Sequence, residues 1–104
     1  MFAGFEKQTR RVNGVDTAYR MGGSGPALLL LHGHPQTHMI WHKVAATLAQ
    51  HFTVIAADLR GYGDSSKPDD DAAHFNYAKR TMAADMAELM SALGFERFKV
   101  LAHD

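Results

Sequence analysis

The chain contains no cysteine and only three prolines, and its longest uninterrupted apolar run covers residues 26–31 alone. Without cysteine it can form no disulfide, no Cys-ligated zinc site and no thiolate nucleophile, which fits a reducing compartment. The apolar run is far too short to cross a bilayer, and residues 1–7 lack the apolar core of a signal peptide. We therefore expect a cytoplasmic protein with no membrane partner.

Neither sign of charge is in excess, because 11 Lys and Arg residues balance 11 Asp and Glu residues. Such a chain has no basic field that would hold nucleic acid. Hydrophobic residues make up 46% of the 104 residues and charged residues 21%, which is typical of a folded globular protein. Residues 1–104 suit one small domain or a piece of one.

The first structured segment is a predicted β-hairpin over residues 8–20. Strand-like runs at 9–12 and 15–20 flank Asn13-Gly14, and both of these residues tolerate the positive φ angles of a tight turn. The Gly-rich stretch 22–26 then precedes a strand instead of following one, so it does not match a phosphate-binding fingerprint.

Apolar runs at 27–31, 52–57 and 98–102 alternate with predicted helices at 38–50 and 78–93. Continuous hydrophobicity predicts strands that are covered on both faces, as in a parallel sheet. The first helix is expected to bury Ile40, Val44 and Leu48, whereas residues 61–73 are polar and form a loop. This order predicts an α/β fold in which the hairpin is followed by parallel βαβαβ units with right-handed crossovers.

The second helix has one apolar face, which we interpret as core and not as a cofactor site. Gly94 stands where a left-handed residue ends a helix, and Phe95 is placed for the apolar contact that follows it. The residues of this face are Met82, Met86, Leu89, Met90 and Leu93.

The chain stops directly after the strand at 98–102, so that strand would lack its covering helix and leave an apolar edge open. We therefore expect that 104 residues do not complete the folded unit and that the sheet is incomplete. Either the sequence is truncated, or the chain is interrupted at a chemically modified Asp104.

Polar or glycine-rich clusters follow all three buried strands. They are His-Gly-His-Pro at 32–35, Asp-Leu-Arg-Gly-Tyr-Gly-Asp-Ser at 58–65 and His-Asp at 103–104. Functional groups gather at the carboxyl ends of strands in open parallel sheets. The sequence therefore predicts an active site at this edge.

These three clusters, in this order and spacing, resemble motifs of the α/β-hydrolase fold. His32-Gly33-His34-Pro35 resembles the oxyanion loop, Asp58-x-Arg60-Gly61-x-Gly63-x-Ser65 the loop after the next strand, and Ala102-His103-Asp104 the start of the nucleophile elbow. The resemblance runs from about residue 27 to the end and implies the N-terminal half of that fold. An Asp at the nucleophile position, with Met-Phe-Ala-Gly-Phe at 1–5 and Ser-Ser-Lys-Pro at 65–68, is similar to the fluoroacetate (haloacetate) dehalogenases.

The resemblance implies that Asp104 is a catalytic nucleophile. A carboxylate is ionised at neutral pH and can displace a leaving group from an sp³ carbon, which gives an ester that activated water then hydrolyses. The second step needs backbone N–H donors for the oxyanion. The resemblance implies that the His34 backbone N–H is one donor and the residue after Asp104 the other. The alternative for His34 is an exposed loop residue. The alternative for Asp104 is a strand-end residue that caps a following helix.

Several motif residues also have structural interpretations. We expect His32 to orient the oxyanion loop, and Trp41 to pack. Asp58 and Arg60 could form a catalytic acid pair, but the resemblance implies that they hold their loop. Residues 69–71 (Asp-Asp-Asp) are interpreted as a solvated turn and not as a calcium loop.

We expect no metal and no cofactor. His34, His38 and His42 are spaced four apart, but Pro35 interrupts the helix between the first two, and no HExxH motif is present.

The resemblance implies hydrolytic dehalogenation of a small halogenated carboxylic acid, such as fluoroacetate or chloroacetate going to glycolate. The histidine base, its acid partner and the halide and carboxylate binders are expected in the remainder of the chain, and a homodimer is left open. The alternatives are an epoxide hydrolase or haloalkane dehalogenase of the same fold, or a non-catalytic α/β-hydrolase relative.

Overall fold

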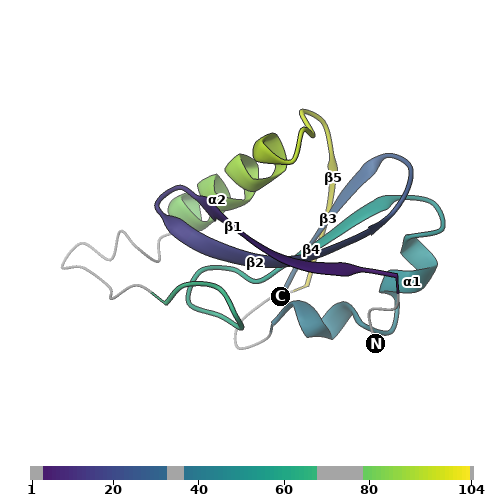
Figure 1. Cartoon of the computed structure of the whole chain (residues 1–104), viewed down its shortest axis with the longest axis horizontal. Coiled ribbons are helices and arrows are strands. Elements are labelled where there is room, and N and C mark those ends of the chain that lie inside the picture. Colours follow the sequence, from purple (N-terminus) through teal and green to yellow (C-terminus); the bar gives the residue numbers. More distant parts are fainter. Residues whose placement is uncertain (1–3, 33–36, 68–78, 104) are drawn as a thin grey trace.

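A five-stranded mixed sheet with helices on both faces makes up the computed structural model, which describes residues 4–32, 37–67 and 79–103 (Figure 1). The strand order across the sheet is β1-β2-β4-β3-β5. The strands are β1 (Glu6–Val12), β2 (Val15–Gly23), β3 (Ala27–Leu31), β4 (Thr53–Ala57) and β5 (Lys99–Ala102). The helical elements are the 3₁₀ helix η1 (His38–Trp41), α1 (Ala45–Leu48) and α2 (Lys79–Ala92).

The predicted hairpin is confirmed, and its strands are longer than expected at their outer ends. β1 and β2 pair antiparallel, with Val12 opposite Val15 next to the turn. Asn13 and Gly14 have φ angles of 49° and 80°. Positive φ at both central residues matches the right-handed twist of the flanking strands, which is why Asn-Gly closes this hairpin.

The predicted parallel unit is also confirmed, and β3 lies at its centre. β3 pairs in parallel with β4 on one side and with β5 on the other. Four of its five residues are buried. Leu29 packs in the cluster that contains α2, whereas Leu28 and Leu30 pack with Trp41 and Ala45 on the other face. The continuous apolar run therefore reflects cover from two layers.

The helix α2 ends as its sequence predicts. The Phe95 N–H donates to the Met90 carbonyl at 2.9 Å, the Gly94 N–H donates to the Ser91 carbonyl at 3.0 Å, and Gly94 has a φ of 92°. This pair of bonds is the Schellman motif. Met86, Leu89 and Met90 are buried in the core, as the apolar face predicted.

The prediction of one helix over residues 38–50 was wrong. The Ile40, His42 and Val44 N–H groups bond to carbonyls three residues earlier, and α1 spans four residues only. The tighter 3₁₀ winding of η1 brings His38 and Trp41, three residues apart, onto one buried face. Val44 lies beyond η1 and is 43% exposed, against the expectation that it would be buried. Trp41 packs in the core, as we expected.

The strand predicted at 98–102 is confirmed, and so is the open apolar edge expected for it. β5 spans Lys99–Ala102, and all four of its residues are exposed, with Val100 at 52%. In the described part of the chain β5 pairs with β3 alone and forms the edge of the sheet. A strand is buried only where neighbouring layers cover its faces, and apolar sequence does not supply that cover.

Residues 61–67 form no helix or strand, as expected for the polar loop, and the predicted turn at 69–71 lies outside the described residues. Among the helices that the structure describes, none has the length and hydropathy needed to cross a bilayer.

Leu89→Ala tests whether α2 is docked on the sheet. Leu89 is fully buried, so the full-length protein should lose about 2–5 kcal/mol of unfolding free energy in urea denaturation, because the truncation leaves a cavity. Glu88→Ala on the exposed side of the same helix is the matched control and should change stability by less than about 0.5 kcal/mol. Equal effects of the two substitutions would contradict the packing of α2.

Candidate active site

The carboxyl ends of β3, β4 and β5 meet at one edge of the sheet because the three strands are parallel. The connection from β3 to β4 carries η1 and α1 on one face, and the connection from β4 to β5 carries α2 on the other. β4 and β5 thus lie on opposite sides of β3, so the winding changes direction there. In open α/β sheets the ligand crevice lies beyond the strand ends at such a point.

The predicted donor His34 and the predicted nucleophile Asp104 lie outside the described residues. Their described neighbours are close to one another at this edge. The His103 N–H donates to the Leu31 carbonyl at 2.9 Å, so the parallel pairing of β3 with β5 continues to the residue before Asp104.

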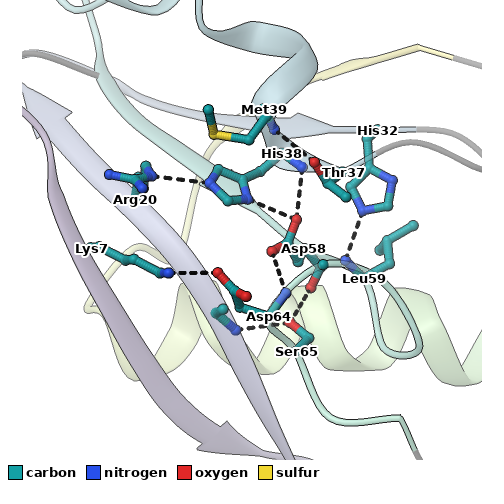
Figure 2. A network of polar contacts seen from close by, with 12 residues as sticks. Lys7, Arg20, His32, Thr37, His38, Met39, Asp58, Leu59, Asp64 and Ser65 are labelled. Atoms are coloured by element: carbon teal, nitrogen blue, oxygen red, sulfur yellow. Dashed lines mark hydrogen bonds and ion pairs between the residues drawn. The ribbon is translucent and has the colours of Figure 1, made fainter. Parts of the chain in front are cut away.

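His32 ties the end of β3 to the end of β4. Its Nε2 accepts a hydrogen bond of 3.0 Å from the Leu59 N–H (Figure 2). The ring packs edge-on against Tyr62, with centroids 5.2 Å apart, and is 3% exposed. An imidazole that accepts at Nε2 carries its proton at Nδ1. His32 therefore has a structural contact at the strand ends.

The carboxylate of Asp58 joins two loops at the end of β4. Its Oδ1 accepts from the His38 N–H at 2.7 Å and from the His38 Nδ1 at 2.8 Å, and its Oδ2 accepts from the Asp64 N–H at 3.0 Å (Figure 2). Asp58 is fully buried. A buried carboxylate is stable only when its oxygens are supplied with donors, and here both loops supply them.

These donors determine the charge of Asp58. Burial by itself would raise the pKa of the carboxyl, but hydrogen bonds from the His38 ring, the His38 N–H and the Asp64 N–H lower the pKa below its ordinary value of 3.8. Asp58 is therefore ionised at neutral pH and can only accept hydrogen bonds there.

His38 receives a second contact from the sheet. The Arg20 Nε donates to the His38 Nε2 at 3.0 Å. Because a guanidinium can only donate, Nε2 must be the acceptor, and the proton of the ring lies on Nδ1, facing Asp58. The resulting chain of bonds links β2, η1 and the end of β4.

Both ring nitrogens of His38 thus bond to protein, and the His42 Nδ1 lies 2.8 Å from the Met39 carbonyl. Within residues 4–32, 37–67 and 79–103, no cluster of three His, Asp or Glu side chains could hold a metal ion.

The loop after β4 is held against β2 by two serines. The Ser65 hydroxyl accepts from the Ala18 N–H and donates to the Asp58 carbonyl, at 2.8 and 2.7 Å. The Ser66 hydroxyl accepts from the Asp16 N–H at 2.8 Å. These contacts account for the Ser-Ser of the motif, since each hydroxyl satisfies a backbone group at the margin of the sheet.

Arg60 pairs with Asp85 of α2, not with Asp58. Its Nε and one terminal nitrogen bond to the two Asp85 oxygens at 2.6 and 2.7 Å, and the Asn13 amide adds a third bond at 2.9 Å. Both charged side chains are buried. This bidentate pair holds the loop against α2 and the hairpin turn, in line with the implied structural role of Arg60.

Our sequence reasoning missed Asp85 as the partner of Arg60. The available signal was its position, because Asp85 is a lone carboxylate beside Met82, Met86 and Leu89 on the apolar face of the predicted helix. A carboxylate placed in a core requires a cation or several donors.

Asp58→Asn tests the contribution of the buried carboxylate to stability. The pKa of Asp58 is higher in the unfolded protein than in the folded protein, so the unfolded protein takes up this proton first as the pH falls. The stabilisation by Asp58 is therefore complete above about pH 4, and it is lost as the pH falls through the pKa that Asp58 has in the folded protein. We expect a loss of about 1–3 kcal/mol at pH 7 in urea denaturation of the full-length protein, and a smaller loss near pH 3.

The matched control for this experiment is Asp16→Asn, because the Asp16 side chain is 53% exposed and pairs with Arg11 at the surface. Exposed pairs contribute little, so the difference in stability between pH 7 and pH 3 should stay close to that of the parent. A parent-like pH profile for Asp58→Asn would contradict the assignment.

Gly63→Ala tests the packing of the loop against Asp58. Gly63 has a φ of 53°, and a Cβ there would overlap the Asp58 carboxylate. Gly94→Ala is the matched control, since Gly94 has a φ of 92° with open space around it. Both substitutions carry a backbone cost of about 1–2 kcal/mol. Gly63→Ala should cost about 1–3 kcal/mol more in chemical denaturation, because the bonds to Asp58 are displaced as well. Equal costs would contradict the contact.

Comparison with known proteins identifies relatives of this chain. The family model described as the alpha/beta hydrolase fold matches residues 26–104. A fluoroacetate dehalogenase from Burkholderia sp. is 55% identical over the whole chain, which covers 34% of that protein. A soluble epoxide hydrolase from Corynebacterium sp. (strain C12) is 48% identical over 89% of the chain, which covers 31% of that protein.

A solved structure is also similar to this chain. A crystal structure of a candidate α/β hydrolase from Nostoc sp. PCC 7120 superposes with a TM-score of 0.98 at 52% identity and covers the whole chain, which spans 36% of that protein. The chain spans about a third of the length of the relatives that it matches. With the family model matching most of the sequence and the same strands and helices superposing on a relative, this chain belongs to the α/β-hydrolase fold family.

Proposed function

We propose that the full-length protein is a hydrolytic dehalogenase that removes halide from a small haloacid such as fluoroacetate, with Asp104 as the nucleophile. The observation that carries this proposal is the 55% identity with a fluoroacetate dehalogenase along the whole chain. The position of Asp104 in the sequence supports it, since the residue directly before it is bonded to the end of β3. That point is the change of winding where ligands bind in open α/β sheets.

The proposed reaction has two steps. In the first, a carboxylate oxygen of Asp104 attacks the carbon that bears the halogen, and the halide leaves with the bonding electron pair. In the second, a water that has given its proton to a histidine beyond residue 104 attacks the ester carbonyl of Asp104. The resulting oxyanion collapses and expels the alkoxide of glycolate, which takes the proton of the new Asp104 carboxylic acid, so that the Asp104 carboxylate is regenerated. The proton held by the histidine passes to solvent. The scheme uses no cofactor and no metal.

The two steps make different demands on the backbone. Displacement at an sp³ carbon develops no oxyanion on Asp104, whereas ester hydrolysis places a negative charge on an oxygen of the former Asp104 carboxyl group. Backbone N–H donors stabilise such an oxyanion. We assign one of them to His34, whose segment begins after His32 at the end of β3, and the other to the residue that follows Asp104.

Epoxide hydrolysis is the second candidate, and the 48% identity with a soluble epoxide hydrolase favours it. The same carboxylate can open an epoxide to an ester, with the alkoxide as the leaving group. The substrates differ in that a haloacid carries a carboxylate, which calls for a cation in the residues that follow Asp104.

Halide release and isotope transfer test both candidates on the full-length protein. Fluoroacetate and chloroacetate should release halide, and Asp104→Ala should abolish that release. In a single turnover in ¹⁸O-labelled water, the product oxygen should be unlabelled and the label should appear in Asp104, because water attacks the ester carbonyl. Label in the product would contradict an aspartyl ester. Turnover of epoxides without halide release would replace the first candidate with the second.

A further inference from the structure

The hairpin turn contains an asparagine that is followed directly by a glycine. Asn13 and Gly14 are both exposed, and there is open space around Gly14. Asparagine before glycine is prone to spontaneous deamidation, because glycine has no side chain that would hinder its backbone nitrogen from reaching the asparagine side chain. The other asparagine of the chain, Asn76, precedes a tyrosine. The sequence and the exposure therefore point to Asn13 as a site of chemical modification.

The side chain of Asn13 is bonded to a buried carboxylate. The turn between β1 and β2 lies beside α2 (Figure 1), and the Asn13 Nδ2 donates to the Asp85 Oδ1 at 2.9 Å. Asp85 is fully buried and also accepts two bonds from Arg60, at 2.6 and 2.7 Å. Because a guanidinium that binds both oxygens fixes the carboxylate in position and direction, Asp85 is a rigid acceptor for the Asn13 amide.

The backbone of Asn13 is held by the same pair. Its carbonyl accepts a longer bond of 3.5 Å from a terminal nitrogen of Arg60, and its φ angle is 49°. Asn13 therefore has one bond from its side chain and one from its carbonyl, on the two sides of its Cα–C bond. Rotation about that bond would weaken at least one of these contacts.

Deamidation needs only water and proceeds through a ring. The Gly14 nitrogen gives its proton to hydroxide and forms a bond to Cγ of Asn13. The Cγ–Nδ2 bond then breaks, and ammonia leaves with the bonding electron pair and a proton from water, which closes a succinimide. Water adds to either ring carbonyl and breaks its bond to the Gly14 nitrogen, so that aspartate or isoaspartate replaces the asparagine. One water is consumed and one ammonia is released.

The Arg60–Asp85 pair opposes closure of this ring. The ring contains the Cα–C bond of Asn13, so closure rotates that bond away from its value in the hairpin turn, against the contacts on both of its sides. An N–H that donates to a carboxylate also raises the electron density of its amide, which makes Cγ a poorer electrophile. Both effects slow the attack by Gly14.

We propose that Asn13 is a site of spontaneous deamidation and that the buried Arg60–Asp85 pair slows this reaction in the folded protein. The product loses the contact that restrained it, because an aspartate has no amide N–H to donate. It also places a second negative charge within hydrogen-bonding distance of the Asp85 carboxylate. Deamidation therefore weakens the contact between the hairpin turn and α2.

The experiment follows the full-length protein during incubation at neutral pH. Peptide mapping by mass spectrometry measures the conversion of amide to acid at Asn13 and at Asn76. In the parent unfolded by guanidinium chloride, Asn13 should convert faster than Asn76 and faster than Asn13 of the folded parent. Conversion of Asn13 that is no faster than that of Asn76 in the unfolded chain would overturn the assignment of the site.

Asp85→Ala tests the restraint in the folded state. Hydrogen bonds to charged groups shift an equilibrium by about 10- to 100-fold, and we expect conversion of Asn13 to rise by about that factor. If this variant fails to fold, Asp85→Asn keeps a carbonyl acceptor without the charge and should raise the rate by a smaller factor. A parent-like rate in the folded variant would overturn the role of the pair.

Leu30→Ala is the matched control for lost stability. Leu30 is fully buried on the face of the sheet opposite α2, so its truncation destabilises the fold and leaves the bonds of Asn13 in place. Under conditions where both variants are folded, Leu30→Ala should convert Asn13 at the rate of the parent. Equal acceleration in Leu30→Ala and Asp85→Ala would show that unfolding controls the reaction, and would overturn the inference.

The product provides a further test. The deamidated fraction of aged parent protein, separated by ion exchange, should unfold at a lower temperature than the unreacted fraction. Equal unfolding temperatures would contradict the contact between Asn13 and Asp85 on which the inference depends.

Discussion

At the end of β4, a carboxylate that is out of contact with water accepts three hydrogen bonds from two loops. The carboxylate of Asp58 could not remain ionised there without them, and the loops could not approach the sheet so closely without an acceptor for their N–H groups. Each side of this contact therefore requires the other. The same contact explains the glycine at position 63, because the Asp58 carboxylate occupies the space that the Cβ of a larger residue would need.

The residues that follow β4 connect the two layers of the molecule. Asp58 bonds to η1, which packs with one face of the sheet, and Arg60 bonds to Asp85 of α2, which packs with the other. Two buried polar contacts thus connect the end of β4 to elements on opposite faces of the sheet. Paired buried charges add less stability than apolar packing of the same volume, but they are directional, so they fix the orientation of the segment that follows β4 relative to both layers.

The chain accounts for part of the chemistry proposed for the full-length protein. It contains the carboxylate that is proposed to attack and the residue that is proposed to supply one oxyanion donor, and both lie outside the described residues. This chain covers 34% of the length of the fluoroacetate dehalogenase that it resembles.

The sequence by itself determined the elements that depend on local rules. Asn13-Gly14 specified the hairpin turn, continuous apolar runs specified the parallel strands, and Gly94 specified the end of α2. The family also followed from the motifs, because their order and spacing are properties of the chain. Only the tertiary structure decided the winding of residues 38–41 and the partners of Asp58 and Arg60. Those partners lie 20 and 25 residues away, and folding alone brings such distant groups within hydrogen-bonding distance, so no local pattern could specify them.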